Sequence, residues 1–184
     1  HYHKLSHKHK SISQFDAFSY QVRATNALAF AKCIPNATIS QKLRYYKCLN
    51  DITKELQAVS EQMPHNFLHC YLLVKGAKAQ LKGHYLEAIK AFTEAIDNAK
   101  KGDFYLLVAL GNELAGELAM EQGLQMTAFG YIREAHYYYT LYGMGMKVNT
   151  LEKRHPACFL ANTQVIQATD SKGSSSSSST SLSL

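Results

Sequence analysis

One unit of sequence occurs twice between Met63 and Pro156, and each of its small residues returns at the same interval, as Gly76 returns at Gly116. Small residues that return at a fixed interval on helical segments mark places where neighbouring helices approach closely. The repeat therefore predicts an all-α stack, and it favours a surface that binds or transmits over a pocket that performs chemistry. The recurring positions are Gly76, Ala79, Gly83, Ala88, Phe92 and Ala95, and then Gly116, Ala119, Gly123, Ala128, Ile132 and Ala135.

Two further helices are expected before the repeat, and each is ended by a proline, at Pro35 and at Pro64. Both segments place apolar residues three or four positions apart, which is typical of an amphipathic helix. Over 14–32 the expected inward positions are Phe15, Phe18, Val22, Thr25, Leu28 and Ala29. Over 40–62, with Ser40 as the N-cap, they are Leu43, Tyr46, Leu49, Ile52, Leu56 and Val59.

Each repeat unit divides into two helices. In the first unit, 65–102, we expect helices over 66–81 and 85–100, and in the second, 103–143, a helix from Asp103 as N-cap to Gly123 and another over 126–141. A short capping helix is expected over 146–154. The helical domain then covers 14–156, between a basic, His-rich lead-in (1–13) and a Ser-rich linker or tail (157–184). That tail has too little apolar surface to offset the entropy of ordering it.

Composition limits the classes of partner. The net charge of the whole sequence is +6, but it is spread along the helices, and the segment 103–156 by itself carries −2. No dense basic stripe for nucleic acid is therefore expected. No apolar run is long enough for a membrane helix. Four scattered cysteines without a Cys-x-x-Cys pair are typical of a cytoplasmic protein. Because the sequence starts at His1 without an initiator Met or signal peptide, we expect a fragment of a longer protein.

No catalytic, cofactor or metal site is expected. A phosphate-binding GxxxxGK[ST] loop is absent from the sequence, and Gly143-Met144-Gly145 follows a predicted helix and not a strand. Four histidines in the lead-in, at positions 1, 3, 7 and 9, could ligate zinc or copper, but no cysteine or carboxylate lies nearby to complete a site. The remaining histidines are interpreted as structural. The segment is therefore predicted not to be an enzyme.

Two charged sets of equal spacing suggest a contact between the units. Glu113, Glu117 and Glu121 lie four residues apart on one helix face, a pattern that commonly marks a solvated surface. Our hypothesis is that they meet a basic face of the preceding unit, formed by Lys75, Lys78 and Lys82.

Tyrosines crowd the helix predicted over 126–141. A helix cannot bury three consecutive residues on one face, so at least one of Tyr137 and Tyr138 should be exposed or packed on the following short helix. Exposed Tyr is a favoured interface residue. Tyr137, Tyr138 and Tyr142 are therefore possible interface residues, and packing against the helix at 146–154 is the structural alternative.

Within each unit the spacing resembles the tetratricopeptide consensus. The matching positions are Gly76, Gly83, Tyr85, Ala88, Phe92 and Ala95, and then Gly116, Gly123, Gln125, Ala128, Ile132 and Ala135; Gln125 departs from the consensus because it lacks an aromatic ring. The resemblance implies about three antiparallel helical pairs and a short capping helix. The standard repeat has about 34 residues and is shorter than the interval seen in this sequence, so these helices should be longer by roughly a turn and a half in all.

The segment from Met63 onward also resembles the helical region of large hybrid sensor histidine kinases. The similarity rests on Pro64-His65-Asn66-Phe67, a Glu-Ala-Ile run, Ala-Leu-x-Asn-Glu-Leu, a Tyr-Ile-x-Glu-Ala pattern, Tyr-x-x-Tyr-Gly and Lys147-Val148 through Leu151-Glu152 to His155-Pro156. Tyr142 stands where Trp is usual, and Met144 where Ala is usual. The match extends weakly back to about residue 15.

In that family this region lies between a signal-transduction ATPase domain and a GAF sensor domain. The resemblance therefore implies a non-catalytic sensor and connector in a phosphorelay, which acts through protein contacts or a ligand-induced conformational change. Its partners would be neighbouring domains of the same chain or another protein, and its parent an ATP-dependent histidine kinase. The alternative is a free-standing tetratricopeptide-like adaptor that binds a partner peptide.

Overall fold

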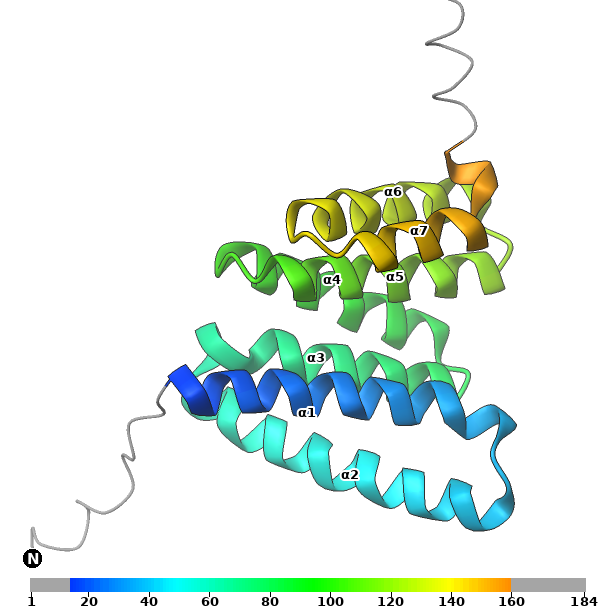
Figure 1. Cartoon of the computed structure of the whole chain (residues 1–184). Coiled ribbons are helices and arrows are strands. Elements are labelled where there is room, and N and C mark those ends of the chain that lie inside the picture. The colour runs from blue at the N-terminus through cyan, green and yellow to red at the C-terminus, as the bar shows by residue number, and fades with distance from the viewer. Residues whose placement is uncertain (1–13, 160–184) are drawn as a thin grey trace, which may run out of the picture.

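The fold is an all-α, tetratricopeptide-like stack of three antiparallel helical hairpins, α1/α2, α3/α4 and α5/α6, followed by the short capping helix α7 (Figure 1), which confirms the predicted fold class. A computed structural model describes residues 14–159, with side chains described from residue 18, and this range contains no strand. The elements are α1 Gln14–Cys33, η1 Ile34–Asn36, α2 Ile39–Gln62, α3 Pro64–Leu81, α4 Tyr85–Lys101, α5 Tyr105–Glu121, α6 Gln125–Leu141, α7 Gly145–Arg154 and η2 Pro156–Cys158.

The structure describes the C-terminal boundary of the helical domain but not the two terminal segments. The lead-in 1–13 and residues 160–184 of the tail lie outside the described residues. At the C-terminal end, the folded chain continues past the predicted boundary at 156. Cys158 in η2 is buried, and its carbonyl oxygen accepts a hydrogen bond of 2.8 Å from Nε of Arg133 on α6.

Four turns of one type set the length of the helices. Gly83, Asp103, Gly123 and Gly143 follow one another at equal spacing along the chain, and each has a positive φ, of 75°, 56°, 74° and 83°. In each turn the next residue donates its backbone N–H to the carbonyl five positions back, as His84 does to Ala79 at 2.9 Å. This is the Schellman pattern that ends a helix through a left-handed residue.

Asp103 was expected to be the N-cap of the fifth helix, and this was wrong. Phe104 is the N-cap, and Asp103 occupies the left-handed position that Gly takes in the other three turns. Asp is one of the few residues other than Gly that visit this conformation. Ser40 is not an N-cap either, because α2 begins one residue earlier: Thr38 caps it and forms a capping box with Gln41.

The face that α1 buries differs in part from the prediction. Leu28 is buried as predicted, but Phe18 and Val22 are 64% and 40% exposed, and α1 buries Ala24, Ala27 and Ala31 instead. Small side chains at the contact let α1 lie close to α3. Along α2 the prediction is correct for Leu49 and Leu56, which are fully buried, but Leu43 and Tyr46 are exposed. Helix α2 forms one end of the stack, so no other described helix covers them.

Glycines of α3 and α5 allow the two helices of a hairpin to meet. A Cβ on Gly76 would lie 2.6 Å from Cε1 of Phe92, and one on Gly116 would lie 2.7 Å from Cδ1 of Ile132. These two pairs occupy equivalent positions in the two repeat units. Gly83 and Gly123, by contrast, serve the turns. The other recurring positions are buried: Ala79, Ala88, Ala95, Ala119, Ala128 and Ala135.

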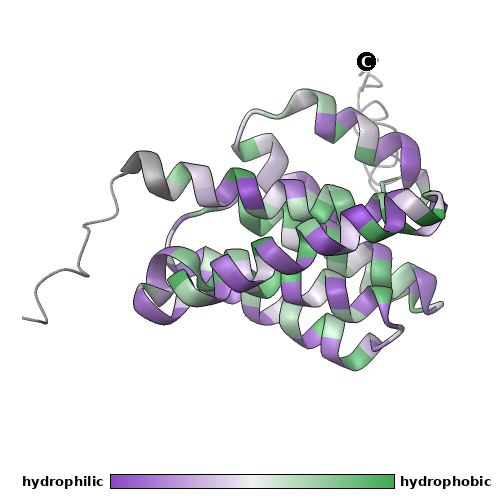
Figure 2. Ribbon diagram, turned by 90° about the horizontal axis from the view of Figure 1, so that it is seen from below, coloured by the Kyte–Doolittle hydropathy of each residue, from purple (hydrophilic) through white to green (hydrophobic). Residues whose placement is uncertain are grey.

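Buried apolar residues form two clusters. The larger extends from Ala24 on α1 to Leu118 on α5, and the smaller joins α5, α6, α7 and η2 through Ala109, Ile132, Ala135, Tyr139, Leu151 and Cys158. Hydrophobic and hydrophilic residues alternate along each helix (Figure 2), as expected for helices with one inward face. None of the described helices is long and apolar enough to cross a bilayer.

Candidate functional site: the groove and the contacts of α7

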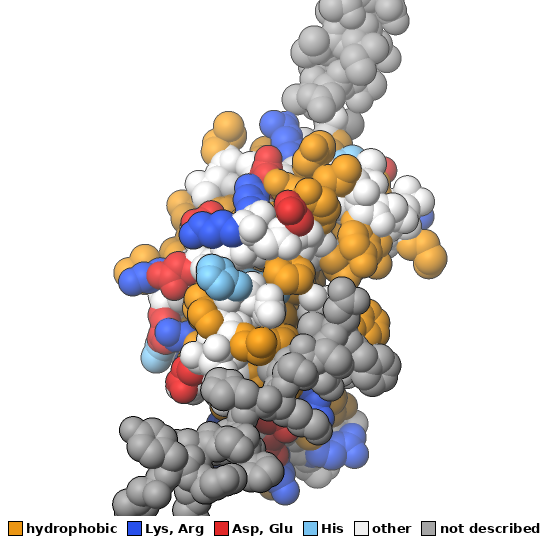
Figure 3. Space-filling view, turned by 90° about the vertical axis from the view of Figure 1, so that its left-hand side faces the viewer, with side chains coloured by type: hydrophobic (Ala, Val, Ile, Leu, Met, Phe, Trp, Pro, Cys, Tyr) orange, Lys and Arg blue, Asp and Glu red, His pale blue; other side chains and the backbone are white. Residues whose placement is uncertain are grey.

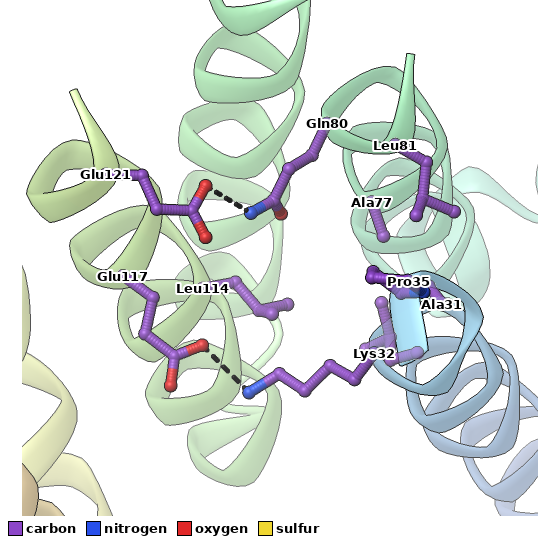
Figure 4. A pocket seen from close by; sticks show the side chains of 10 residues that line it. Ala31, Lys32, Pro35, Ala77, Gln80, Leu81, Leu114, Glu117 and Glu121 are labelled. Carbon is purple, nitrogen blue, oxygen red and sulfur yellow. Dashed lines mark hydrogen bonds and ion pairs between the residues drawn. The ribbon is translucent and has the colours of Figure 1, made fainter. Parts of the chain in front are cut away.

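The candidate site is a groove formed by the first helix of each hairpin. Its volume is about 440 Å³, and residues of α1, η1, α3 and α5 line it. Its floor is apolar, made by Leu28, Ala31, Ala77, Leu81 and Leu114, and Pro35 lies beside it (Figure 4). A groove with an apolar floor and a few polar groups at its edge has the features by which proteins bind the side chains of a peptide segment.

Two polar contacts cross the groove. Nζ of Lys32 on α1 lies 2.8 Å from Oε2 of Glu117 on α5, and Nε2 of Gln80 on α3 donates to Oε2 of Glu121 at 3.0 Å (Figure 4). Both carboxylates belong to α5, so this helix provides the acidic wall of the groove. The two contacts connect α5 with the first helices of both preceding hairpins.

A buried carboxylate lies one turn before Glu117. Glu113 is 0% exposed and accepts hydrogen bonds from three side chains. The hydroxyl of Tyr139 donates to its Oε2 at 2.5 Å, Nζ of Lys147 lies 2.8 Å and 3.1 Å from its two oxygens, and Nη2 of Arg154 lies 2.9 Å from Oε1. Tyr139 belongs to α6, and both cations belong to α7. The carboxylate therefore fixes α7 against α5 and α6.

The electrostatics of this cluster favour a charged Glu113. Burial alone would raise its pKa, but the hydrogen bonds from Lys147 and Tyr139 outweigh burial and hold the pKa below its usual value. Burial and the neighbouring Glu113 carboxylate raise the pKa of Tyr139, so its hydroxyl remains a donor. At neutral pH the cluster is thus a buried anion between two cations and a neutral phenol.

The predicted contact between the two charged sets is wrong. Glu113 and Glu117 bind cations of α7 and α1, and Glu121 binds Gln80, so none forms an ion pair with Lys75, Lys78 or Lys82. Lys78 instead has its pKa lowered, chiefly by burial and then by Lys82 and Lys54. Glu113 is not on a solvated face either, because α5 is covered by helices on both sides.

The groove and the Glu113 cluster are connected through one residue. Glu117 contacts Lys32 in the groove through Oε2 and Nη1 of Arg154 through Oε1, at 2.5 Å. Arg154 also binds Glu113. The result is a continuous series of charges, here called the charge chain: Lys32, Glu117, Arg154, Glu113 and Lys147. It runs from the groove to both ends of α7.

The sequence did not predict the charge chain, although two of its features can be recognised in the sequence. Lys147 and Arg154 are seven residues apart and therefore share one face of a short helix. Glu113 is the first charged residue of α5, and the residues before it in that helix are uncharged and mostly apolar. Glu113, Tyr139 and Lys147 lie on three different helices, and the structure brings them into one contact.

The tyrosines proposed as interface residues lie in different environments. Tyr137 and Tyr142 are 58% and 55% exposed, as expected for at least one tyrosine of the run. Tyr138 is half-buried and lies over Lys100 of α4 and beside Tyr105 of α5. These two contacts are with α4 of the preceding hairpin and with α5 of its own hairpin. Exposed Leu141 and Met146 extend the apolar surface around Tyr142.

The remaining histidines and cysteines do not assemble a metal site among the described residues. His69 is the most unusual: it is 0% exposed, its ring lies 4.3 Å from that of Phe104, and burial lowers its pKa to about 4. His136 lies at the surface of α6, 2.8 Å from Glu152 of α7. The four histidines of the lead-in lie outside the described residues.

Charges on the visible surface are mixed in sign. Figure 3 shows a face on which Lys and Arg side chains stand among Asp and Glu and are separated by hydrophobic side chains.

Comparison of the chain with models of protein families, with curated proteins and with solved structures gives no match. The groove and the charge chain are therefore the observations on which a functional proposal can be built.

Proposed function

We propose that this domain is a non-catalytic sensor and connector of a multidomain hybrid histidine kinase. It would bind a polypeptide segment in the groove and pass the resulting change through α7 to the domain that follows. The kinase context rests on the resemblance of residues 63–156. The coupling rests on one observation, the charge chain that joins the groove to α7.

The charge chain suits this role because α7 has few other contacts with the rest of the stack. Of its ten residues only Leu151 is buried, and its other contacts are the half-buried Val148, the contact of Glu152 with His136, and the ion pairs of Lys147 and Arg154 with Glu113. An occupant that moves α1 relative to α5 changes the contact between Lys32 and Glu117. Arg154 shares Glu117 with Lys32, so the position of α7 responds.

Hydrogen exchange of the α7 amides tests the coupling. Lys32→Gln removes the first link of the charge chain without touching α7, and we expect the amides of 148–154 to exchange about two- to fivefold faster, as loss of a partly exposed ion pair allows. The matched control is Arg23→Gln, which removes the α1 to α2 ion pair with Glu55 outside the chain. Equal exchange in α7 for both variants would contradict the coupling.

Deletion tests the kinase context. If the parent protein is a hybrid histidine kinase, removing 63–156 should abolish the dependence of autophosphorylation on its signal. Unchanged signal dependence would rule out a connector role. The 184-residue chain by itself should hydrolyse no ATP and accept no phosphate, because we assign the catalytic steps to other domains of the parent. We also propose that it acts in the cytoplasm, without a metal or cofactor.

A second candidate is a free-standing tetratricopeptide-like adaptor, favoured by the groove itself. Such an adaptor would bind a partner peptide over the apolar floor without any attached kinase. The reading frame distinguishes the two: codons beyond Leu184 for a GAF domain support the connector, and a stop codon supports the adaptor.

A further inference from the structure

The two carboxylates of the groove differ in how they are neutralised. Glu117 contacts two cations, Lys32 and Arg154. Glu121 is exposed and, among the described residues, has the neutral amide of Gln80 as its partner and no cation within ion-pair distance. It is therefore the carboxylate of the groove that can still accept a positive charge.

Glu121 also occupies a central position. A second hollow, of about 50 Å³, lies beside the groove and is lined by Gly83, Tyr85 and Leu118. Gln80 and Glu121 line both spaces, so their hydrogen bond stands between the small hollow and the apolar floor. A segment that lies along the groove and enters the second hollow must pass Glu121.

We propose that the occupant of the groove is a segment of a partner protein that places an aliphatic side chain on the floor and a Lys or Arg on Glu121. This proposal rests on the proposed function and names the chemistry of its partner. A Lys or Arg brings a positive charge to Glu121, whose carboxylate otherwise accepts from the neutral amide of Gln80, and so adds an ion pair to the hydrogen bond. Arg can also bind both carboxylate oxygens at once.

An acidic occupant fits the groove less well. Its carboxylate would have to displace Glu117 from Lys32, and that exchange would leave the Glu117 charge with Arg154 alone. It would also lie close to the negative charge of Glu121. The aliphatic part of the occupant has no such conflict, because the floor carries no charge and the partly exposed Leu81 lies beside the buried Leu28 and Leu114.

Selection from random peptides tests the proposal without assuming a sequence. Dodecapeptides displayed on phage are selected on the full 184-residue chain, and we expect the enriched peptides to combine Leu, Ile, Val or Met with Lys or Arg. One enriched peptide is then synthesised, and its Kd is measured by fluorescence anisotropy. Glu121→Gln should weaken it about tenfold, the change that a lost charge-assisted bond of about 1.4 kcal/mol produces.

A matched variant separates the groove from general electrostatics. Glu87→Gln removes an exposed carboxylate of α4, which lies outside the groove next to His84, and should leave the Kd unchanged. A peptide with its basic residue changed to Glu should lose binding to the natural chain and regain it on Glu121→Lys. Circular dichroism and the melting temperature of each variant show whether the fold is intact.

The outcomes distinguish this proposal from the function on which it rests. Enriched peptides that bind the groove without a basic residue, or that bind Glu121→Gln as tightly as the natural chain, overturn the proposed chemistry and leave groove binding intact. No enrichment at all overturns both. A dimer of the free chain that Glu121→Lys dissociates in sedimentation experiments would make a second copy the occupant, and the proposal would be wrong.

Discussion

Glu113 carries its charge in a position from which solvent is excluded, and donors from α6 and α7 offset the cost of burying it. Glu113→Gln keeps the shape of the side chain but leaves Lys147 and Arg154 without their common anion. We expect the free energy of unfolding to fall by about 1.5–3 kcal/mol, the range for hydrogen bonds to charged groups, because both cations are more than a third exposed and can turn toward water. Urea unfolding at pH 7 measures the change.

Glu134→Gln is the control for that substitution. Glu134 pairs with Lys100 at 3.4 Å between two half-exposed side chains, so its loss should change the free energy of unfolding by less than about 1 kcal/mol. Comparable effects of the two variants would mean that burial of Glu113 contributes nothing to the strength of its contacts.

His69 gives the fold a dependence on pH. Burial lowers its pKa to about 4 from 6.5, so between these values the unfolded chain binds a proton that the folded chain does not. Stability contributed by the neutral ring is complete above about pH 6.5 and is lost as the pH falls toward 4. At about 1.4 kcal/mol per pKa unit the loss approaches about 3 kcal/mol. Urea midpoints measured from pH 7 to 4.5 should fall accordingly.

His69→Leu identifies the group responsible. Leu has a similar volume and does not titrate, so the fall between pH 6.5 and 4.5 should largely disappear, whereas His84→Leu at the exposed start of α4 should retain it. Glu113 adds a separate loss at lower pH: its folded pKa lies below the unfolded value, so its contribution persists above the unfolded pKa and disappears as the pH falls through the folded one. A fall retained in His69→Leu would assign the dependence to another group.

At the scale of the helices, two glycines in the partner helices of one hairpin should respond in opposite ways to the same change. Gly116→Ala puts a Cβ 2.7 Å from Cδ1 of Ile132 and forces α5 away from α6, so we expect a loss of about 1–3 kcal/mol. Gly130 lies within α6 and faces open space. Gly130→Ala should therefore stabilise the chain by about 1 kcal/mol, since Gly weakens a helix interior. Thermal and urea unfolding give both signs.

The order of the helices was predictable because breaks in the sequence are local signals. Pro64 and the glycines at 83, 123 and 143 end helices through backbone geometry that depends on neighbouring residues alone. The buried face of α1 was not predictable in this way. Large apolar residues suggested Phe18 and Val22, but where α1 packs on α2 and α3 it buries Ala24 and Ala27 instead. Which face is buried depends on what packs there, and sequence spacing does not contain that information.

In the candidate site, too, the spacing of residues within a helix was predictable, but the pairing of residues from different helices was not. The spacing of Lys147 and Arg154 and that of the three glutamates are local, and both could be read as faces of helices. Their pairing is not local: Lys32 and Glu117 are 85 residues apart, and only the stacking of three hairpins brings them together. Equal spacing therefore favoured the wrong lysines. The groove itself has no sequence signal, because small and aliphatic residues line it as they line the core.

Across the whole molecule, the two separate apolar clusters imply that two parts of the stack can differ in the free energy needed to open them. Phe92 belongs to the cluster shared by α1 through α5, and Leu151 belongs to the smaller one that joins α6, α7 and η2 to Ala109 of α5. Stacked helical repeats open from their ends because an end element is covered by neighbours on one side alone. We therefore expect α7 and η2 to open without unfolding of α3, α4 and α5.

Two large-to-small substitutions separate these levels. Phe92→Ala should lower the free energy of global unfolding by about 3–5 kcal/mol and accelerate hydrogen exchange in every helix from α3 to α6. Leu151→Ala removes the one buried side chain of α7, so exchange should accelerate strongly in 148–158 and much less in α3 and α4. If Leu151→Ala accelerates exchange equally throughout the stack, the two clusters unfold as one unit. In that case α7 could not open while the helices of the groove stay folded.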